Sequence, residues 1–343
     1  MTILQCTSLS KHYGRGEELV KALEGVSLSL EQGSFTAITG PSGSGKSTLL
    51  HMLGGLDRPT EGSVQFRDKD LYRLRDDQLA ILRRRQFGFV FQSYNLVREL
   101  TGMENILLPL MLDKRSPDEA YLNRLIDILG IGSRRNHLPS AMSGGQQQRV
   151  AIARTLAPEP SVLFMDEPLS NLDAKLRLEM RYELQRLHLE TGSTFVYVTH
   201  DQMEAMTLAT RICLINNGVL QQYDPPLKVY NSPDNLFVAD FVGNPSINFI
   251  NAHGDQEGEN IRLTMLGWAE ARFIPNEKLD LAAWYVKRDA DAEVAAAANA
   301  ERAKAKGYVE KSNKDEAFRP HIAKVEENDA ALPEEPEIAD GDF

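Results

Sequence analysis

A glycine-rich segment at residues 40–48 has the residue types that hold phosphate. It reads GPSGSGKST, matches the pattern G-x-x-x-x-G-K-[ST], and lies between an apolar stretch and a helix-like stretch. Its glycines let backbone N–H groups turn inward around phosphate oxygens, and the following helix presents its positive end there. We expect Lys46 to neutralise the β- and γ-phosphates of a nucleotide and Ser47 to ligate Mg²⁺. The other predicted phosphate contacts are Ser42, Gly43, Ser44, Gly45 and Thr48.

Two acidic residues follow an apolar stretch at residues 162–165. This stretch predicts a strand buried on both faces, and such strands deliver the next residues to the carboxyl edge of a parallel sheet, where a phosphate loop lies. Asp166 is then placed to contact Mg²⁺, directly or through water. Glu167 points elsewhere and can polarise an attacking water as a general base, a role that contributes roughly 10²–10⁴-fold to a rate. Together the two segments predict a site that hydrolyses a nucleotide.

Short apolar stretches alternate with longer amphipathic ones over residues 1–235. This alternation predicts an α/β fold with a mainly parallel sheet flanked by helices. The interval 103–136 contains no convincing strand, and with its flanks it predicts an inserted helical subdomain at about residues 97–155. The predicted strands are Phe35–Thr39, Phe87–Phe91, Val162–Met165, Phe195–Thr199 and Arg211–Ile215, and the predicted helices include Lys46–Leu56 and Ala174–Thr191.

The segment MSGGQQQR at residues 142–149 resembles the signature L-S-G-G-Q of ABC transporter ATPases, with Met142 in place of leucine. It opens an apparent helix at residues 146–156, where a hydroxyl and bare N–H groups lie at the positive helix end. The residues alone therefore predict a second phosphate cradle. The resemblance implies that this cradle serves the ATP held by the Lys46 loop of another subunit, in a head-to-tail pair with two ATP molecules between them. The cradle residues are Ser143, Gly144, Gly145 and Gln146.

Four further positions resemble motifs of the same family, in the family's order along the chain. Tyr13 matches the aromatic residue that stacks on adenine, and Gln92 matches the glutamine that senses Mg²⁺ and the attacking water. Asp173 ends the segment SNLD, which matches the family's D-loop at the nucleotide, and His200 matches the switch histidine that contacts the γ-phosphate. The resemblance thus implies an ATPase with ATP and Mg²⁺ as ligands. Its implied catalytic residues are Glu167, His200 and Gln92, and its implied metal ligands are Ser47, Gln92 and Asp166.

Composition and charge narrow the class of protein. Of the 343 residues, 42% are hydrophobic and 25% are charged, as in ordinary globular proteins. No apolar run approaches the ~20 residues that span a bilayer, and we expect no signal peptide. Cys6 and Cys213 have no metal-ligand spacing and are expected to be core residues in a reducing compartment. The net charge of −11 is concentrated after residue 288, which argues against a nucleic-acid partner.

The two halves of the chain resemble ATPases of different transporters. Residues 16–110 resemble those of lipoprotein-release and macrolide-type exporters, whereas residues 143–250 resemble those of carbohydrate importers of the maltose and multiple-sugar type. We favour the importer because the chain continues past residue 230, near which exporter-type ATPases end. The export system is the alternative. The segments that carry the resemblances are 16–23 and 79–96 for the exporters, and 169–177, 199–206 and 241–249 for the importers.

Three further segments are expected after the cassette at residues 1–235. Residues 236–288 are predicted to begin a small β-rich regulatory domain, with short strands around its glycines. A Gly-Ile-Arg-Pro-Glu motif of that domain is absent, so we expect the domain to be divergent or incomplete. Residues 289–325 predict a helical insertion rich in Ala, Lys and Glu, and residues 326–343 predict an acidic, disordered tail.

The resemblance also implies partners and a location. A second cassette, either the same chain or a close paralogue, would complete the dimer, and membrane permease subunits would dock near Gln92–Met103. An extracytoplasmic solute-binding protein would act indirectly, and the chain would lie at the cytoplasmic face of the membrane as a peripheral subunit. Two other ABC classes fit less well. Translation proteins carry two cassettes in one chain, and chromosome-associated proteins insert a coiled coil that is missing between Lys46 and Ser143.

Overall fold

The computed structural model describes residues 1–16, 19–243, 247–250, 252–266, 268–274, 280–283, 286–287 and 290. Its contacts divide the chain into two compact units, residues 1–247 and residues 248–343, and each unit is described by itself. Every residue that the sequence assigns to a phosphate, metal or catalytic role lies in unit 1.

Unit 1 is built around a six-stranded sheet in the order β10-β9-β3-β8-β7-β6. The five strands from β9 to β6 are parallel to one another, and β10 pairs antiparallel with β9 at the edge. This sheet confirms the predicted α/β fold, and each of the five predicted strands is present to within one residue at either end. The strands are β3 Phe35–Thr39, β6 Phe87–Val90, β7 Val162–Asp166, β8 Thr194–Val198, β9 Arg211–Asn216 and β10 Val219–Asp224.

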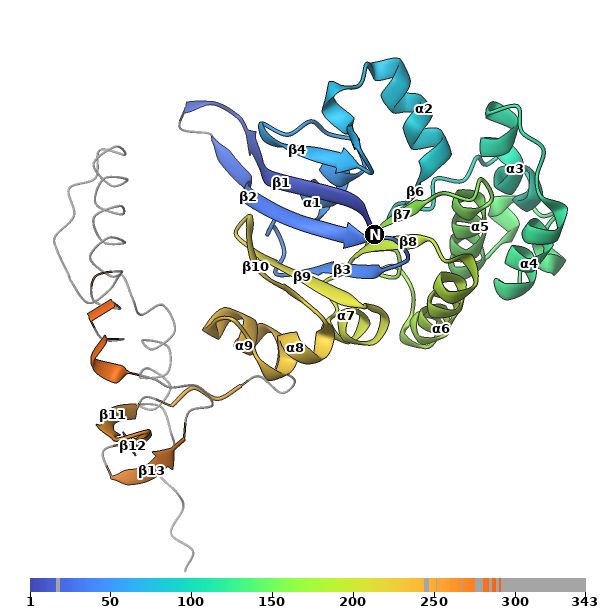
Figure 1. Ribbon diagram of the computed structural model, residues 1–343. Helices are drawn as coiled ribbons and strands as arrows, with labels where there is room; N and C mark the ends of the chain where they lie inside the picture. Colours follow the sequence, from blue (N-terminus) through green and yellow to red (C-terminus); the bar gives the residue numbers. More distant parts are fainter. Residues whose placement is uncertain are drawn as a thin grey trace, which may run out of the picture. The chain divides into compact units, whose positions relative to one another are not determined.

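Helices flank this sheet (Figure 1). The predicted helix at residues 174–191 is confirmed, but the one predicted to end at Leu56 is too long. It ends at Leu53, because Gly54 and Gly55 follow and Gly55 adopts a left-handed φ of 68°. The helices are α1 Lys46–Leu53, α2 Asp76–Gln86, α3 Gly102–Leu112, α4 Glu119–Ile128, α5 Gly144–Leu156, α6 Ala174–Thr191, α7 Gln202–Leu208, α8 Pro226–Asn231 and α9 Leu236–Val242.

The central strands are buried on both faces. Successive side chains of a strand point to opposite faces of the sheet, so they pack into different apolar clusters. In β8, Phe195 and Tyr197 join the apolar cluster that includes residues of α3, α4, α5 and α6. Val196 and Val198 join the cluster that contains α1. All residues of β3 and β8 are buried. The packing on both faces therefore fixes the position of the residues that follow each strand at the carboxyl edge.

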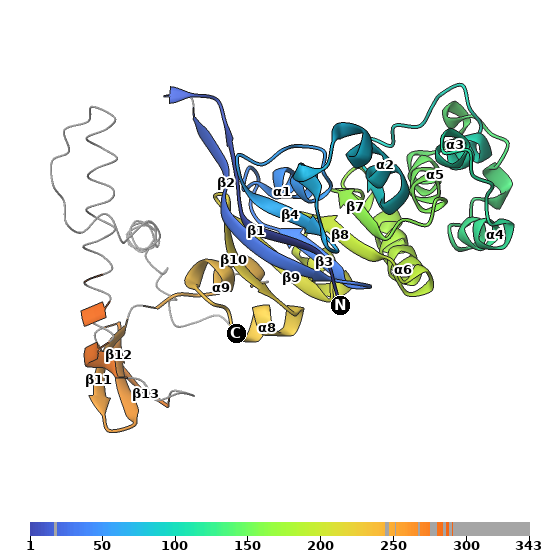
Figure 2. The same cartoon turned by 45° about the horizontal axis from the view of Figure 1, so that its top comes forward.

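The sequence pattern does not predict the second sheet of unit 1, which is antiparallel and has the order β2-β1-β4-β5. The apolar residues of β1 do not alternate strictly, because its pairing with β2 shifts between Cys6 and Leu9 and again between Leu9 and Lys11. This sheet packs with α1 in one apolar cluster, and Figure 2 shows it as a layer on that side. Its strands are β1 Thr2–Tyr13, β2 Val20–Glu31, β4 Glu61–Phe66 and β5 Lys69–Asp70.

The interval between β6 and β7 is helical, as predicted. The structure describes all of residues 91–161 and places no strand among them, and α3 and α4 lie together at one end of unit 1 (Figure 1). The side chain of Asn105, in α3, is buried and accepts a hydrogen bond from Val97 N at 2.9 Å. It also donates to the carbonyls of Val97, Leu100 and Thr101. These bonds fix the segment that leads from Gln92 into the helices.

Unit 1 continues past residue 235, where the sequence places the end of the cassette. The reason is α9, whose Val238 and Val242 are buried in a cluster with Ala37 and Ile212 of the central sheet. Unit 2 contains a three-stranded antiparallel sheet in the order β11-β12-β13, in agreement with the short strands expected there. Apart from residue 290, the predicted segments 289–325 and 326–343 lie outside the described residues. The strands are β11 Ala252–Glu257, β12 Asn260–Met265 and β13 Ala269–Phe273.

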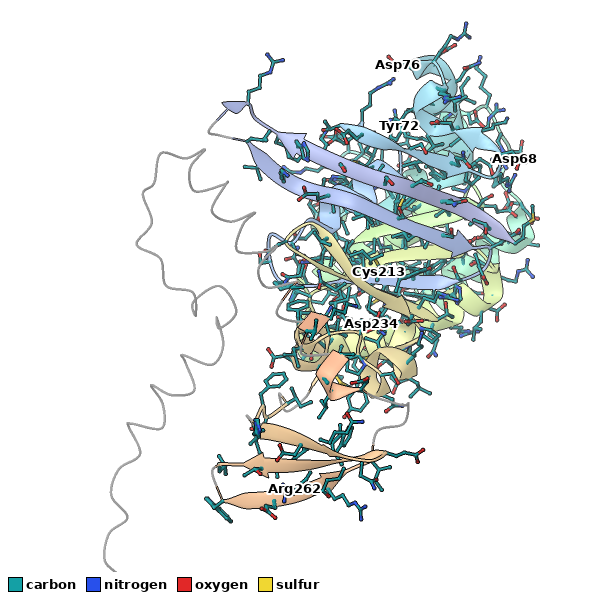
Figure 3. The ribbon with its side chains drawn as sticks, turned by 60° about the vertical axis from the view of Figure 1, so that its left-hand side comes forward. Asp68, Tyr72, Asp76, Cys213, Asp234 and Arg262 are labelled. Carbon is teal, nitrogen blue, oxygen red and sulfur yellow. The ribbon has the colours of Figure 1, made fainter. Side chains whose placement is uncertain are left out.

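Both cysteines are free and buried, as predicted, and Cys213 lies in β9 (Figure 3). In the part of the chain that the structure describes, no helix has the length and apolar character needed to cross a bilayer.

Candidate nucleotide-binding site

The phosphate loop connects β3 to α1, as the sequence predicts. Gly43 and Gly45 have φ values of 75° and 100°, in the region that favours glycine, and Gly45 is the N-cap of α1. A Cβ on Gly45 would collide with the carbonyl oxygen of Ala22, so the loop lies directly against β2. Ser44 Oγ is buried and has no hydrogen-bond partner among the described residues. A buried polar group of this kind suits a loop that binds a polar ligand.

Lys46 is 6% exposed, and its Nζ donates to the carbonyl oxygens of Gly40 at 3.1 Å and Pro41 at 2.9 Å. Its ammonium group therefore lies over its own loop. Burial lowers the pKa of Lys46, while the nearby carboxylates of Glu167 and Asp166 act in the opposite direction. A partly desolvated ammonium at the positive end of a helix attracts phosphate strongly.

The end of β7 meets the phosphate loop through a hydrogen bond from Ser47 Oγ to Asp166 Oδ1, 2.9 Å long. His51 Nε2, one turn along α1, lies 3.8 Å from Asp166 Oδ2. A hydroxyl beside a carboxylate is the oxygen donor set that Mg²⁺ takes when phosphates and water complete its shell. The described residues contain no group of three or more His, Cys, Asp or Glu side chains that could hold a metal without such help.

Glu167 and His200 form a pair across the ends of β7 and β8. His200 Nδ1 lies 3.3 Å from Glu167 Oε2, and the side chains are 60% and 26% exposed. Glu167 has a left-handed φ of 44°, which is uncommon for a residue with a side chain. Its backbone is held there, because Glu167 N donates to Val198 O at 3.1 Å and Ser170 Oγ donates to Glu167 O at 2.8 Å. Strain of this type clusters at functional sites.

The predicted Gln92 lies just beyond β6 and is exposed. Its carbonyl oxygen accepts a hydrogen bond from Asn171 Nδ2 at 3.0 Å. Asn171 belongs to the segment 170–173 that ends at Asp173, the N-cap of α6. Asp173 Oδ1 accepts from Leu176 N at 3.0 Å, so its side chain is engaged in capping. The hydrogen bond from the side chain of Asn171 to the backbone of Gln92 therefore joins two of the predicted site segments.

The signature segment is placed differently from the residues above. Ser143 is the N-cap of α5, and its side chain forms a reciprocal capping box with Gln146. Gly145 packs so closely on Leu176 that a Cβ would collide with it. Ser143 and Gly144 are exposed. Among the described residues, no hydrogen bond or ion pair joins this segment to the phosphate loop.

Tyr13 lies near the phosphate loop at the end of β1, 43% exposed. Its hydroxyl donates to Asp57 Oδ2 at 2.7 Å, and Lys11 Nζ lies 4.9 Å from the ring centroid while also pairing with Asp57. Burial raises the pKa of Tyr13, the hydrogen bond to Asp57 and the charge of Asp57 raise it further, and a hydrogen bond with the side chain of Thr48 acts in the opposite direction. Sequence reasoning missed Asp57, because a single aspartate after a helix carries no motif.

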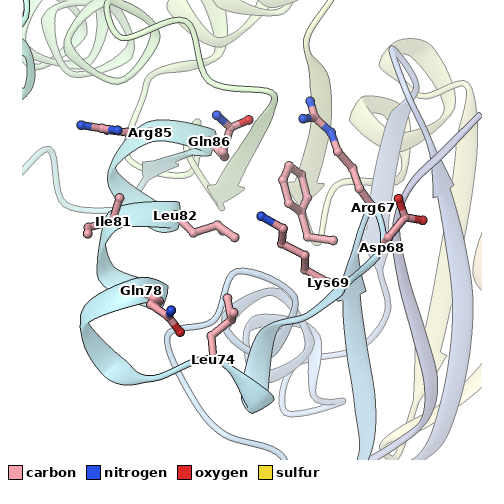
Figure 4. A pocket seen from close by; sticks show the side chains of 10 residues that line it. Arg67, Asp68, Lys69, Leu74, Gln78, Ile81, Leu82, Arg85 and Gln86 are labelled. Carbon is pink, nitrogen blue, oxygen red and sulfur yellow. The ribbon is translucent and has the colours of Figure 1, made fainter.

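A large cavity lies elsewhere in the structure. It measures about 500 Å³ and lies between the turn after β4 and helix α2 (Figure 4). Arg67 and Lys69 border it on one side, and Leu82 and Gln86 on the other. Its lining includes none of the residues predicted for phosphate, metal or catalysis, so cavity size does not locate the candidate nucleotide-binding site.

Known proteins share this cassette. Residues 23–170 match the family model for the ABC transporter. Three import ATP-binding proteins are each 43% identical to this chain. They are the trehalose/maltose protein MalK of Thermococcus litoralis, over 244 residues that cover 70% of this chain and 65% of that protein; the xylose/arabinose protein XacK of Haloferax volcanii, over 265 residues that cover 76% and 67%; and the maltose/maltodextrin protein MalK of Aliivibrio fischeri, over 252 residues that cover 73% and 66%.

A solved structure is also similar. It is a dimeric post-hydrolysis state of the ATP-binding cassette MJ0796 bound to ADP and Pi, with a TM-score of 0.59 and 40% identity. The similarity covers 65% of this chain and 99% of that one. The fold and the phosphate loop define a P-loop cassette. The chain belongs to the ABC transporter family of ATP-binding proteins, and its alignments span about two thirds of the length of these curated relatives.

Proposed function

We propose that this chain binds and hydrolyses ATP as a subunit of an ABC transporter that powers uptake of a carbohydrate through separate permease subunits. The observation that carries the proposal is the pair of contacts at one sheet edge. Ser47 meets Asp166 at 2.9 Å, and the next residue, Glu167, meets His200 at 3.3 Å. A phosphate-binding loop and a candidate base are thus held side by side.

The proposed chemical roles combine these positions with the roles that the family resemblance implies. Lys46 and the loop N–H groups bind the β- and γ-phosphates, while Ser47, Asp166 and Gln92 would hold Mg²⁺. When bound, Mg²⁺ neutralises charge that develops on the phosphate oxygens. Glu167 accepts the proton of the attacking water, and His200 donates a hydrogen bond to the γ-phosphate. The remaining loop contacts are Ser42, Gly43, Ser44, Gly45 and Thr48, and Tyr13 stacks on the base.

A second cassette completes the site in this proposal. The N-terminus of α5 comprises Ser143, Gly144, Gly145 and Gln146, of which Ser143 and Gly144 are exposed. It presents the positive end of the helix, which favours an anion. Its bonds lie within its own helix, so its partner phosphate belongs to another molecule. Asp173 lies at the same interface. A dimeric relative bound to ADP and Pi supports this arrangement.

The permease is proposed to dock near Gln92–Met103. A groove of about 390 Å³ lies between β6 and helix α3, and Arg154 of its lining donates to the carbonyl oxygens of Tyr94 and Asn95 in that segment. Leu56, Phe89, Leu108 and Leu112 contribute to its lining, and Leu112 is 65% exposed. An apolar helix of a membrane subunit is a suitable occupant. This docking would hold the chain at the cytoplasmic face of the membrane, with a solute-binding protein acting on the far side.

Carbohydrate import is favoured over export because the similar proteins named above are import proteins for maltose, trehalose, xylose and arabinose. The test is to delete the gene and measure accumulation of these four radiolabelled sugars. Uptake of at least one should be lost, and it should return with the unmodified chain but not with Glu167→Gln. Unchanged uptake of all four, together with loss of macrolide or lipoprotein export, would overturn the import assignment.

Docking has its own matched pair of variants. Leu112→Glu should abolish uptake and leave ATP hydrolysis by the isolated chain intact, because it replaces an apolar contact of the groove, which Arg83, Arg84 and Arg154 also line, with a carboxylate that an apolar helix would have to desolvate. Met111 is also 65% exposed but does not line the groove, so Met111→Glu should preserve uptake. Equal effects of the two changes would remove the groove as the permease site.

A further inference from the structure

A buried polar network connects the strand before His200 with helices α6 and α7. Its centre is Glu204, a residue of α7 that is 4% exposed. Glu204 Oε2 accepts hydrogen bonds from Tyr197 Oη and Thr199 Oγ1, both at 2.7 Å. Glu204 Oε1 lies 3.4 Å from Arg181 Nη2 of α6. Burying a carboxylate costs free energy unless hydrogen bonds and an opposite charge compensate for it, so Glu204 stays buried because of these contacts.

The network holds the backbone on both sides of His200. Thr199 Oγ1 donates to Glu204 and accepts from Asp201 N at 2.9 Å. Asp201 Oδ2 accepts from Arg181 Nη2 at 2.8 Å, and its other oxygen accepts from the N–H groups of Met203 and Glu204. The residues immediately before and after His200 are therefore each bonded to the same cluster.

His200 itself has little packing to fix it. Its side chain is 60% exposed, and among the described residues its polar side-chain contact is with Glu167. The side-chain position thus depends on the backbone that carries it. A cavity of about 10 Å³, on the scale of one water molecule, is lined by residues of the polar network and by the Glu167–His200 pair. They are Glu167, Ser170, Arg177, Thr199, His200, Asp201 and Glu204.

We propose that Glu204 is a positioning residue for His200, because it clamps Thr199 and, through Arg181, Asp201 on the two sides of the histidine. This inference rests on the proposed ATPase function and adds a residue that does not contact the nucleotide. Glu204→Gln keeps the size and an oxygen for the two hydroxyls. It replaces the oxygen that faces Arg181 with an amide N–H donor, and it removes the charge.

The expected effect is on turnover and not on binding. Glu204→Gln should lower kcat for ATP by roughly 10- to 10²-fold, the scale of a small misplacement of a reacting group. The KM should change by less than about 2-fold, because the phosphate loop is untouched. A loss that appears in KM with unchanged kcat would overturn the proposal.

The decisive experiment is a double-mutant cycle with His200→Ala, measured as single-turnover ATP cleavage, which stays measurable for slow variants. If Glu204 acts through His200, Glu204→Gln causes no further loss in the His200→Ala background. If the two losses multiply, Glu204 acts independently and the proposal is wrong. Failure of the unmodified chain to cleave ATP at all would instead contradict the proposed function.

Three further variants guard against misfolding of Glu204→Gln. Thr199→Val removes the hydroxyl and should lower kcat, again without further loss in the His200→Ala background. Thr199→Ser keeps the hydroxyl and should stay within about 2-fold of the unmodified rate.

Gln222, which is 2% exposed, forms hydrogen bonds with Asp224 and Ser232 in a separate buried network. Gln222→Ala should lower thermal stability and preserve kcat. If Gln222→Ala lowered kcat as much as Glu204→Gln does, general destabilisation would explain the effect of Glu204→Gln.

Discussion

The phosphate loop and the signature segment differ in how far one chain completes them. Lys46 is buried, Ser47 is bonded to Asp166 across the sheet edge, and Glu167 is paired with His200. Ser143, by contrast, is exposed and bonded to the first turn of its own helix. One half of the proposed site is thus assembled by folding, whereas the other is presented to solvent. The difference supports the proposal that two molecules share the site.

The largest effect is expected at the assembled half. Lys46→Ala removes the buried ammonium and should abolish ATP binding, with hydrolysis lowered by at least about 10³-fold, the upper range for losing one electrostatic contact. Equilibrium binding of a fluorescent ATP analogue measures the first effect. Lys21→Ala is the matched control, because Lys21 is 45% exposed and pairs with Glu24 at the surface. Binding that survives Lys46→Ala would remove this loop from the site.

A loss of about 10²-fold is expected for Glu167→Gln, which keeps the shape of the side chain but not the proton acceptor. ATP still binds and is no longer consumed, so the variant should accumulate as an ATP-bound dimer. Sedimentation velocity with ATP and Mg²⁺ tests this, with Lys46→Ala expected to stay monomeric. A Glu167→Gln chain with near-normal turnover would exclude Glu167 as the base.

The smallest effect is expected at the base-binding end. Tyr13→Ala should weaken binding of ATP and GTP by a similar amount, about 1–3 kcal/mol, because stacking does not depend on which purine is present. Tyr13→Phe keeps the ring and loses the hydrogen bond to Asp57, so its affinity should remain close to that of the unmodified chain. Nucleotide titration compares the two. Unchanged affinity in Tyr13→Ala would place the base elsewhere.

The sequence predicts where the segments of the assembled half lie in the fold, because its signals are local. A buried strand, a glycine loop and a lysine follow one another at residues 35–46, and another buried strand ends directly in Asp166 and Glu167. The parallel pairing of β3, β8 and β7 then brings their carboxyl ends to one edge. Short motifs of this kind can be recognised in the sequence without knowing which distant residues they contact.

Other features depend on contacts between distant residues and could not be predicted. The bulges of β1 disrupt its alternation, so neither β1 nor its sheet is recognised. Tyr13 and Asp57 meet across 44 residues. Glu204 resembles an ordinary helix carboxylate, which is usually solvated. Its burial arises because Tyr197, Thr199 and Arg181 converge on it from another strand end and another helix.

The shared site is tested most directly by mixing two inactive variants. Lys46→Ala destroys the phosphate loop, and Ser143→Arg blocks the signature segment, so each variant alone should hydrolyse almost no ATP. In a head-to-tail pair, a mixed dimer has one site with both defects and one intact site. Random pairing of equal amounts makes half of the dimers mixed, so ATPase activity should recover to at least about one quarter of the unmodified rate, and to more if the Lys46→Ala chain does not pair with itself. A mixture that hydrolyses ATP at no more than the mean of the two separate variants would contradict the account.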